Sequence, residues 1–484
     1  MKRLRSFLCA SALGLDGVRK EAWNSYERRE TKQKMGEQPM MKMTRRRFLR
    51  GAAAASVAAG AAPLLGQDIY GRYKTALVGC GWWGTNILNE AIASKKSKVT
   101  GLCDVDEGRA KAARRIVEQK TGIRPNLYVD YRELLDREKP EIVIVATPDH
   151  WHPLVTIDAV KAGAHVYVEK PISHTIIEGK AMVNAARKYG RIVQVGTHRR
   201  VSPHCISGMR FLRSGKAGKI GFVRAFVYYG GSGPEAPTPN EEPPKDLHWD
   251  LWCGPAPLRP FNKKIHPRGF RQFLDYANGT LGDWGIHWLD QILWWTEELY
   301  PRRVFSTGGR PVKGPPVNLP DGQTTDAPDS QSAVYEFESF TAVWEHRLFA
   351  GNGEEKGENV GVYFYGTKGV FHMGWRSGWT FYPVKKGEPP IHEDPQLHKP
   401  DDQNIRELWA DFIDAIRNTR LPVCDIEIAH RSTNMSLLGM LSYKLGRSVD
   451  WDGRREVIVG DDYANLLLRR TYRPGYAYPD PEAV

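Results

Sequence analysis

The feature that most constrains the fold of this sequence is a glycine-rich turn directly after an apolar, strand-like run at residues 74–78. The turn has the spacing G-x-G-x-x-G and consists of Gly79, Gly81, Trp82, Trp83 and Gly84, with a cysteine between the first two glycines. The first glycine permits a tight turn, the second lets the backbone approach a pyrophosphate, and the third lets a helix pack on the sheet. Free N–H groups at the start of that helix favour a phosphate. The pattern therefore predicts a dinucleotide-binding turn.

Apolar runs alternate with helical patterns along the next part of the chain. The runs lie at 74–78, 99–103, 141–146, 165–169 and 192–195, and the helical patterns lie near 86–93, 107–121, 153–162 and 176–189. Such alternation, with nearly continuous apolar strands, is typical of a parallel sheet covered by helices on both faces. We therefore predict an α/β fold whose first domain, residues 72–196, is a Rossmann dinucleotide-binding domain.

An acidic residue at the end of the second run favours one cofactor over another. Asp104 stands 20 residues after Gly84, where a carboxylate can accept hydrogen bonds from the adenosine ribose hydroxyls. The same carboxylate would repel a 2′-phosphate, and no arginine follows it closely. The sequence therefore predicts NAD as the cofactor in preference to NADP.

Two further runs end in polar residues that we expect at the cofactor crevice. Thr147, Pro148 and His152 follow the third run, and Glu169 and Lys170 end the fourth. Ligands bind outside the carboxyl ends of strands in open α/β sheets, so all five residues are predicted to bind the cofactor. A lysine in this place can also hydrogen-bond a substrate hydroxyl. For residues 147–152 the alternative is an ordinary helix start, and for Lys170 it is an exposed surface lysine.

The first 66 residues have the pattern of an export signal. Arg45 and Arg46 precede Phe48 and Leu49, and an uncharged, alanine-rich run extends from residue 51 to residue 66. Paired arginines before a short apolar run resemble the bacterial twin-arginine signal, which predicts a periplasmic or extracytoplasmic protein exported in its folded state. The run is shorter than the roughly 20 strongly apolar residues of a membrane span, so we expect no stable membrane insertion. An uncleaved N-terminal anchor is the alternative.

The distribution of charge argues against a nucleic-acid partner. Residues 1–50 hold 14 Lys and Arg against five Asp and Glu, and so supply +9 of the formal net charge of +13. The remaining chain is only weakly basic, which leaves no electrostatic case for DNA or RNA binding. The six cysteines show no C-x-x-C spacing, and His150 and His152 lack an evident third ligand, so we expect no metal site.

Four motifs together resemble one protein family. The glycine turn, Ala-Thr-Pro at 146–148, Glu-Lys-Pro at 169–171 and the segment at 282–290 are similar in order and spacing to the Gfo/Idh/MocA oxidoreductases. The resemblance implies a second α/β domain with a large, mostly antiparallel sheet, often used to form oligomers, so a homo-dimer or tetramer is expected. It also implies catalytic roles for Lys170, Asp283 and His287. Glucose–fructose oxidoreductase has a tyrosine at the position of His287, so its activity cannot be transferred directly.

The residues of the last motif also support this chemistry by themselves. Asp283 and His287 are four apart in a helical pattern, so we expect them on one face. An imidazole can accept a hydroxyl proton near neutral pH, and the carboxylate could hold its tautomer or bind the substrate. A packed core histidine is the alternative, because four tryptophans surround it in sequence. We also predict that His198, Arg199, Trp252, Arg271 and Asp283 bind the substrate.

The second domain is predicted at residues 197–455, followed by a C-terminal tail at 456–484. A Gly/Pro-rich stretch at 228–250 is expected to form a long loop that covers the active site. Mixed aromatic and basic residues at 249–271 favour a sugar or polyol substrate. Strand pairs at 332–337 with 341–349 and at 360–365 with 369–373 are expected to be antiparallel, and helices are expected at 405–416 and 426–445.

These features predict an exported NAD-dependent oxidoreductase that transfers hydride between a sugar or polyol carbon and the nicotinamide. Because the periplasm holds no NAD pool, the cofactor is expected to be bound tightly. One alternative is an NAD-dependent glycoside-cleaving enzyme that acts through a transient keto sugar. Another is a non-catalytic sugar-binding protein, against which the intact Lys170, Asp283 and His287 argue.

Overall fold

The computed structural model describes residues 73–351, 356–398 and 403–484, which belong to one compact unit, Asp68–Val484. The expected export signal at residues 1–66 lies outside the described residues. Within the described ranges, no helix is long and apolar enough to cross a membrane.

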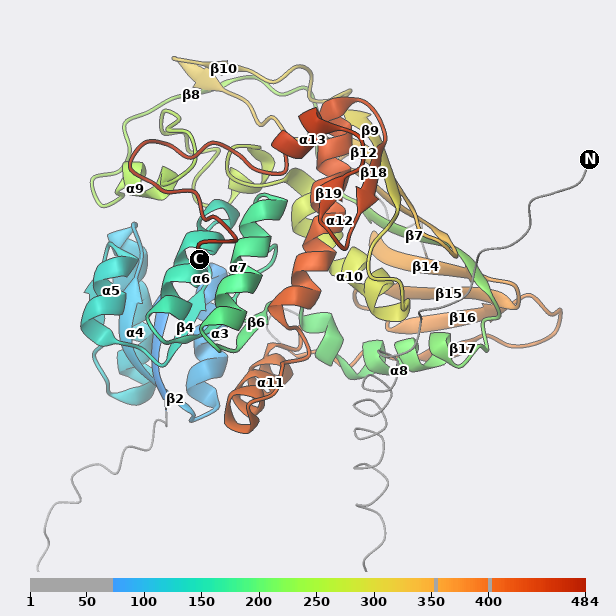
Figure 1. Ribbon diagram of the computed structural model, residues 1–484, viewed down its shortest axis with the longest axis horizontal. Coiled ribbons are helices and arrows are strands. Elements are labelled where there is room, and N and C mark those ends of the chain that lie inside the picture. The colour runs from blue at the N-terminus through green and yellow to red at the C-terminus, as the bar shows by residue number, and fades with distance from the viewer. Residues whose placement is uncertain (1–72, 352–355, 399–402) are drawn as a thin grey trace, which may run out of the picture. The chain divides into compact units, whose positions relative to one another are not determined.

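Six parallel strands form the first sheet, in the order β3-β2-β1-β4-β5-β6 (Figure 1). They are β1 (Tyr73–Val78), β2 (Ser97–Cys103), β3 (Asn126–Tyr128), β4 (Ile142–Val145), β5 (His165–Val168) and β6 (Val193–Val195). β1 pairs in parallel with β2 on one side and with β4 on the other, so the strand order reverses at β1. In such sheets the crevice at the carboxyl ends of these two strands is the ligand site. The predicted Rossmann fold is thus confirmed.

Helices cover both faces of this sheet, as the sequence predicts. Alternate residues of β1 point to opposite faces: Leu77 packs with α3 (Trp82–Ala93) and α4 (Glu107–Thr121), and Val78 packs on the other side. That other side is covered by α5 (Tyr131–Glu138), α6 (His152–Lys161) and α7 (Ile176–Lys188). Polar caps fix where the helices begin. Asp106 accepts a hydrogen bond from the Arg109 N–H at the start of α4, and α7 starts with a capping box.

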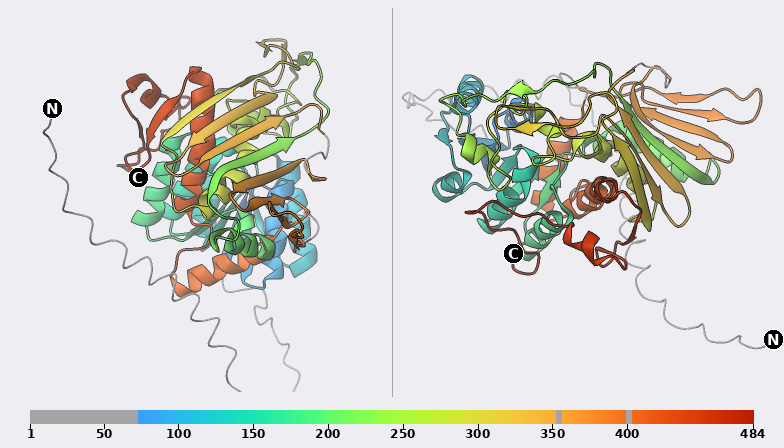
Figure 2. Two further views of the ribbon diagram at one scale, coloured as in Figure 1. Left: turned by 90° about the vertical axis from the view of Figure 1, so that its right-hand side faces the viewer. Right: turned by 90° about the horizontal axis from the view of Figure 1, so that it is seen from above.

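The second sheet has ten strands and lies beside the Rossmann part (Figure 2). Its order is β17-β16-β15-β14-β7-β13-β12-β9-β18-β19. β7 pairs in parallel with β13, and the other pairings are antiparallel, including the two that the sequence predicts, β12 with β13 and β14 with β15. The bounds are β7 (Ile220–Tyr228), β9 (Arg303–Gly309), β12 (Ser330–Glu336), β13 (Thr341–Arg347), β14 (Val360–Gly366), β15 (Gly369–Gly374), β16 (Trp379–Pro383), β17 (Ile391–Glu393), β18 (Val449–Asp452) and β19 (Val457–Ile458).

One face of the large sheet packs against helices and forms the largest hydrophobic core. α8 (Pro203–Arg213), α10 (Ile286–Trp295) and α12 (Ile426–Leu445) contribute to it, and Trp288 and Trp344 are fully buried there. A five-residue π-helical turn at Leu281–Gly285 precedes α10. The helix α11 (Ile405–Asn418) instead packs against α3 through Trp409 and Phe412, so it covers the Rossmann sheet. At the end of the chain, α13 (Asp462–Leu466) follows β19, and Val484 is buried against α7 and α6.

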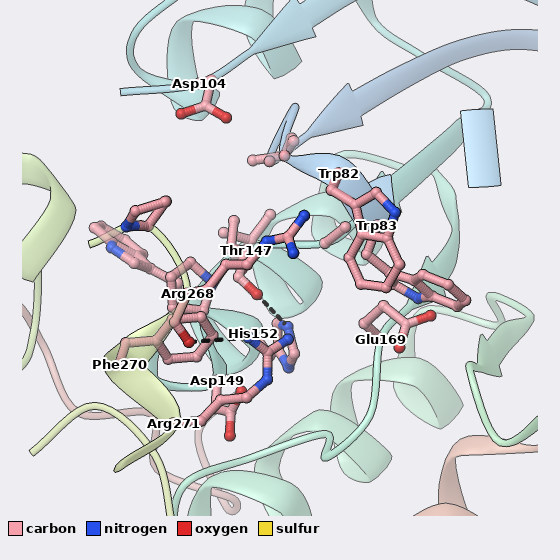
Figure 3. A pocket seen from close by; sticks show the side chains of 18 of the residues that line it. Trp82, Trp83, Asp104, Thr147, Asp149, His152, Glu169, Arg268, Phe270 and Arg271 are labelled. Carbon is pink, nitrogen blue, oxygen red and sulfur yellow. Dashed lines mark hydrogen bonds between the residues drawn. The ribbon is translucent and has the colours of Figure 1, made fainter. Parts of the chain in front are cut away.

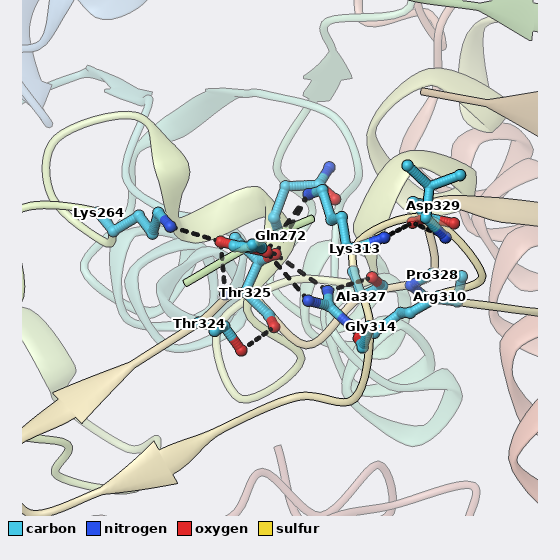
Figure 4. A network of polar contacts seen from close by, with 12 residues as sticks. Lys264, Gln272, Arg310, Lys313, Gly314, Thr324, Thr325, Ala327, Pro328 and Asp329 are labelled. Carbon is cyan, nitrogen blue, oxygen red and sulfur yellow. Dashed lines mark hydrogen bonds and ion pairs between the residues drawn. The ribbon is translucent and has the colours of Figure 1, made fainter. Parts of the chain in front are cut away.

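The Gly/Pro-rich stretch after β7 does not cover the active site, contrary to our expectation. None of residues 229–248 lines the cavity described below. Instead the short strand β8 (Thr238–Pro239) pairs with β11 (Gly322–Gln323), which pairs with β10 (Asn318–Leu319). Glu235 ties this stretch down through ion pairs with Lys264 at 2.6 Å and Arg310 at 3.0 Å (Figure 4). The stretch therefore braces the segment that carries Lys264.

Candidate active site

A cavity of about 530 Å³ opens where the carboxyl ends of the Rossmann strands face the second part of the chain. Most of the predicted site residues line it (Figure 3). These are Gly79, Gly81, Trp82, Trp83, Asp104, Thr147, Pro148, His152, Glu169, Lys170, Trp252, Arg271, Asp283 and His287. The predicted site residues Gly84, His198 and Arg199 do not line it.

The three glycines of the first turn have different surroundings. Gly79 has a φ of +95°, and a Cβ there would lie 2.5 Å from the Ala146 carbonyl. At Gly84 a Cβ would lie 2.1 Å from the Gly79 oxygen, so this glycine lets α3 approach the turn. At Gly81 the nearest atom to a Cβ would be Nη1 of Arg109 at 3.4 Å, so its backbone is open to the cavity. This arrangement fits a pyrophosphate at the start of α3.

Asp104 lies at the carboxyl end of β2 with its carboxylate held by the backbone. It accepts hydrogen bonds from the N–H groups of Cys80 (2.7 Å) and Asp106 (2.9 Å). Burial raises the pKa of Asp104 to about 6, although these hydrogen bonds and Arg109 lower it. Arg109, in the first turn of α4, also lines the cavity, and the sequence analysis missed it because it comes five residues after Asp104.

His152 connects the two loops that follow β4 and β5. Its Nε2 is 2.8 Å from the Thr147 oxygen and its Nδ1 is 2.8 Å from the Pro171 oxygen. Burial lowers the pKa of His152 to about 4, against the raising effect of its two backbone contacts. The residue therefore positions Thr147 and the turn after Lys170. Glu169 follows directly on β5 and is buried, and its carboxylate lies near Trp83 (Figure 3).

Lys170 joins the two parts of the molecule across the cavity. Its Nζ donates to Oδ1 of Asp283 at 2.8 Å and to the Asp283 carbonyl oxygen at 3.0 Å. Arg271, on the short 3₁₀ turn Gly269–Gln272, forms a second ion pair with Asp283 at 3.2 Å. Burial by itself would raise the pKa of Asp283, but Lys170 and Arg271 lower it to about 2. Asp283 is therefore a permanent carboxylate that fixes the lysine ammonium in the cavity.

His287 lies on α10 among aromatic rings and does not pair with Asp283. Its ring centroid is 5.2 Å from that of Trp375 and 5.4 Å from that of His198, and its buried Nδ1 has no hydrogen-bond partner. Asp283 instead bonds Lys170 and Arg271, so of its two expected roles the structure does not support that of holding the histidine tautomer. Burial lowers the pKa of His287 well below its usual range, and Lys170, His198 and Arg199 lower it further.

His198 and Arg199 form a layer behind the cavity wall. Arg199 is buried between the rings of Trp288 and Trp375, with centroid distances of 4.4 Å and 4.2 Å. His198 contacts the same Trp375 and the ring of His287. Both residues therefore contact the aromatic groups that surround His287, and neither lines the cavity where a substrate would bind.

The basic and aromatic residues at 249–271 divide into two groups. Trp252, His266, Arg268 and Arg271 line the cavity, with the guanidinium of Arg268 4.9 Å from the centroid of Trp82. Trp249 stacks on Trp252 outside the cavity, and Lys263 and Lys264 pair with Glu241 and Glu235. Nε2 of His266 also lies 3.5 Å from Oδ2 of Asp106, and Arg271 forms an ion pair with Asp283. The segment 262–271, here called the strap, therefore runs along the cavity.

Asp149 is a further cavity residue that sequence reasoning did not select. It begins the 3₁₀ turn Asp149–Trp151 after β4, is 5% exposed, and has an Oδ2 without a hydrogen-bond partner. Burial raises the pKa of Asp149 to about 7, and the charge of Asp283 also raises it. Arg271 and Lys170 act in the opposite direction and lower it. Within the described part of the chain, no three His, Cys, Asp or Glu residues are grouped so that they could hold a metal ion.

The fold and the cavity define a class of Rossmann oxidoreductase, and comparison with known families identifies it. A model of the Gfo/Idh/MocA oxidoreductases, described as an NAD-binding Rossmann fold, matches residues 73–197. A model of that family's C-terminal alpha/beta domain matches residues 212–303 and 322–478. Together the matches cover more than half of the chain, which therefore belongs to the Gfo/Idh/MocA oxidoreductase family and has its NAD-binding domain.

Several curated relatives match parts of the chain. The inositol 2-dehydrogenase of Salmonella typhimurium is 30% identical over 169 residues, which is 34% of this chain and 49% of the relative. The D-apiose dehydrogenase of Paraburkholderia graminis is 31% identical over 165 residues, or 33% and 43%. Glycosyl hydrolase family 109 protein 1 of Akkermansia muciniphila is 35% identical over 111 residues, or 22% and 23%. The matched region thus spans less than half the length of each of these relatives.

Solved structures share the fold over a longer stretch. A levoglucosan dehydrogenase in complex with NADH and levoglucosan has a TM-score of 0.59 at 18% identity and covers 78% of this chain and 98% of its own. The aldose-aldose oxidoreductase of Caulobacter crescentus, in complex with glycerol, has a TM-score of 0.57 at 21% identity and covers 78% and 99%. At these identities the likeness concerns the fold.

Proposed function

We propose that this protein is an NAD-dependent oxidoreductase that transfers hydride between a hydroxyl-bearing carbon of a sugar or polyol and the nicotinamide. The observation that carries the proposal is the Lys170–Asp283 pair, which fixes an ammonium inside the same cavity that contains the glycine turn and Asp104. The names of the relatives, inositol 2-dehydrogenase and D-apiose dehydrogenase, support a polyol or sugar as substrate.

The residues of the cavity fit a bound dinucleotide. Gly81 leaves open backbone at the start of α3 for the pyrophosphate, and Asp104 offers a carboxylate to the adenosine ribose. Trp82, Trp83, Thr147, Pro148, His152 and Glu169 complete the proposed cofactor site, together with Lys170. Asp104 favours NAD, while Arg109 beside Gly81 gives the site a cation that NADP could also use.

In this proposal Lys170 binds the substrate hydroxyl and stabilises the alkoxide character that develops on its oxygen. Asp283 holds the lysine in position, and Arg271 forms an ion pair with the same carboxylate. His287, which is neutral, orients the hydroxyl through a ring nitrogen, and Trp375 and Trp284 shape the wall around it. The bound nicotinamide supplies the hydride acceptor. Trp252 is proposed to contact the substrate or the cofactor from the second part of the chain, whereas His198 and Arg199 support the histidine from behind.

The strap supports a tightly held cofactor. Arg268 lies over Trp82 of the glycine turn, and His266 lies near Asp106, so two side chains from the second part of the chain approach the Rossmann loops beside the cavity. Glu235 anchors the strap through Lys264 at 2.6 Å. If the dinucleotide binds along these groups, Arg268 would have to leave Trp82 before its release, which would slow exchange.

A second candidate is a glycoside-cleaving enzyme that oxidises its sugar transiently and restores NAD within each turnover. Two relatives favour it by name, the glycosyl hydrolase family 109 protein of Akkermansia muciniphila and an alpha-N-acetylgalactosaminidase of Shewanella oneidensis. Export through a twin-arginine signal remains our proposal for residues 1–66, and it agrees with a resident cofactor that no external NAD pool has to replace.

We also propose that the protein forms a homo-oligomer through the outer face of the large sheet. Phe222 and Phe305 are 39% and 43% exposed on this face, beside Val334, Val343 and Tyr365. In Figure 2 the described helices lie against the opposite face of the sheet. Sedimentation of the wild type and of Phe222→Asp tests this: the variant should shift towards the monomer, and an unchanged mass would argue against this interface.

The experiment that tests the proposed function has two parts. Cofactor released from the denatured, dialysed protein is identified by mass, and the NAD-loaded protein is then mixed with aldoses, cyclic polyols and aryl glycosides. We expect retained NAD(H) and nicotinamide reduction by at least one aldose or polyol. Cleavage of an aryl glycoside without net NADH accumulation would favour the second candidate. A protein that binds no NAD(H) would contradict both.

A further inference from the structure

Three side chains of the strap reach three successive places along the cavity. His266 faces the loop after β2, and Arg268 lies over Trp82 of the glycine turn. Arg271, three residues further along the chain, forms an ion pair with Asp283. A dinucleotide whose pyrophosphate lies at the glycine turn would have its adenosine half towards β2 and its nicotinamide half towards the catalytic lysine. The strap therefore follows the length of the proposed cofactor.

The loop after β2, the expected site of the adenosine ribose, is paired with the second part of the chain. Two backbone hydrogen bonds, of 3.0 and 2.9 Å, join Glu107 and Val105 to the segment 246–248. Asp106 and Leu247 form an antiparallel bridge between them. The second part of the chain is therefore held directly against the loop that would bind the ribose.

The loop after β4 is joined to the same segment a few residues further on. The indole N–H of Trp151 donates to the Leu251 oxygen at 3.1 Å and to the Trp252 oxygen at 3.0 Å. All three residues line the cavity. The segment 246–252 is thus fixed to the loops after β2 and after β4 and contributes to the cavity wall at this end.

His266 lies at the same end and has a ring nitrogen without a partner. Its Nε2 is 3.5 Å from Oδ2 of Asp106, and its ring meets that of Trp252 edge-on, with the centroids 5.9 Å apart. The side chain is 12% exposed, and its buried Nδ1 has no hydrogen-bond partner among the described residues. Buried polar atoms are nearly always hydrogen-bonded, so an unpartnered nitrogen on a residue of the cavity wall indicates a place for a ligand.

The chemistry of the ring suits adenosine. A carboxylate at Asp106 only accepts hydrogen bonds, so in the neutral imidazole the facing Nε2 carries the hydrogen and Nδ1 is an acceptor. Burial lowers the pKa of His266, which favours this neutral form. Adenosine offers matching donors in its ribose hydroxyls and in the amino group of adenine.

We propose that His266 is a cofactor-binding residue, which accepts a hydrogen bond at Nδ1 from the adenosine half of NAD. The second part of the chain thereby completes a site whose other ligands belong to the Rossmann part. Trp252, whose ring contacts that of His266, lies at the adenosine end of the cavity. This inference rests on the dinucleotide site of the proposed function and is independent of the substrate.

Titration of the cofactor-free protein with parts of NAD tests the proposal. ADP-ribose contains the adenosine half, whereas nicotinamide mononucleotide does not. His266→Phe keeps an aromatic ring beside Trp252 but removes both nitrogens, and should weaken the binding of ADP-ribose and of NAD by about 2- to 10-fold, the effect of one hydrogen bond. The affinity for nicotinamide mononucleotide should stay unchanged. Equal affinities of the wild type and His266→Phe for ADP-ribose would overturn the proposal.

Two further variants separate a contact with the cofactor from a general effect on the loop. His266→Asn keeps a polar acceptor near the position of Nδ1 and should retain more affinity for ADP-ribose than His266→Phe. His248 pairs with Glu107 at 3.3 Å and is not among the residues that line the cavity, so His248→Phe should bind ADP-ribose like the wild type. Equal losses in His248→Phe and His266→Phe would refute the assignment.

Deuterium exchange at the imidazole C2 atoms, measured by mass spectrometry, examines the wild type directly. ADP-ribose should slow exchange at His266, nicotinamide mononucleotide should not, and exchange at His248 should change with neither. The measurement requires no variant, so it decides about His266 even if His266→Phe fails to fold. Exchange at His266 that ADP-ribose leaves unchanged would contradict the contact.

The same titrations distinguish this proposal from the proposed function. A wild type that binds neither ADP-ribose nor NAD would contradict the cofactor site, and the role of His266 with it. A wild type that binds both, with His266→Phe unaffected, would contradict only the role of His266.

Discussion

The Nζ atom of Lys170 lies 2.8 Å from Oδ1 of Asp283, and this contact joins the loop after β5 to the π-helical turn before α10. The two residues are 113 positions apart in the chain. Lys170 follows β5 of the first sheet, and Asp283 precedes α10, which packs on the second sheet. Their side chains are 14% and 17% exposed, so the pair is largely shielded from water. The contact therefore fixes the position of the lysine side chain in the site.

We predict that Lys170 and Asp283 are energetically coupled, which a double-mutant cycle of unfolding free energies can measure. Lys170→Met should lower the free energy of unfolding by about 1–3 kcal/mol, because Asp283 then keeps only Arg271 as a cationic partner. Lys170→Met combined with Asp283→Asn should cost less than the sum of the single changes. Urea unfolding measures the three variants. Strictly additive effects would mean that the contact contributes nothing to the folded state.

We predict that Asp104 contributes to the affinity for NAD and to the preference for NAD over NADP. Asp104→Asn should weaken NAD binding by about 1.5–3 kcal/mol through the loss of a charge-assisted hydrogen bond to the ribose. It should also improve NADP binding relative to NAD, since Arg109 remains beside the site. Calorimetric titration of the cofactor-free protein measures both, with the exposed Asp246→Asn as the matched control. Equal NAD affinity in the two variants would remove Asp104 from the cofactor site.

The strap predicts the rate at which cofactor leaves. Arg268→Ala should release NAD about 2- to 5-fold faster, because an exposed cation–π contact contributes roughly 0.5–1 kcal/mol. Lys263→Ala is the control, since Lys263 lies on the same segment and pairs with Glu241 outside the cavity. A chase with labelled NAD gives the dissociation rates. Identical rates in both variants would show that the strap does not retain the cofactor.

The raised pKa of Asp149 predicts how stability depends on pH. Its pKa is about 7 in the folded protein and near 4 when unfolded, so between these values the folded state binds more protons. Asp149 therefore makes stability fall as pH rises from about 4 to about 7, with a slope of at most about 1.4 kcal/mol per pH unit. Asp149→Asn removes this contribution and should be more stable than the wild type at pH 8, but not at pH 4. Urea unfolding at both pH values measures it, and equal differences would contradict the shift.

The sequence predicts the Rossmann part well because its signals are local. Strand-like runs, helix periodicity and the glycine spacing each depend on a few neighbouring residues, and they recover five of the six strands of the first sheet. The missed strand, β3, has only three residues and lies at the sheet edge, and the missed helix α5 is short and rich in charge. Neither has the apolar pattern on which the predictions depend.

The sequence predicts the site less completely, because several site contacts are made across long distances in the chain. The partners of Asp283 are Lys170 and Arg271, and no local pattern excludes the expected contact with His287. Arg199 has the composition of a substrate-binding residue, yet it is enclosed by Trp288 and Trp375. Asp149 was overlooked because burial and an unpartnered oxygen become visible only in three dimensions.

The most direct test of the central claim is to follow the hydride itself. NAD-loaded protein is mixed with aldoses and cyclic polyols that carry deuterium on carbon, and the nicotinamide is recovered and analysed by mass spectrometry, with Lys170→Met as the control. We predict that at least one of these compounds transfers deuterium to the nicotinamide in the wild type, and that the transfer is roughly 10²–10⁴-fold slower in Lys170→Met. A wild-type protein that holds NAD yet acquires deuterium from none of them would contradict the account.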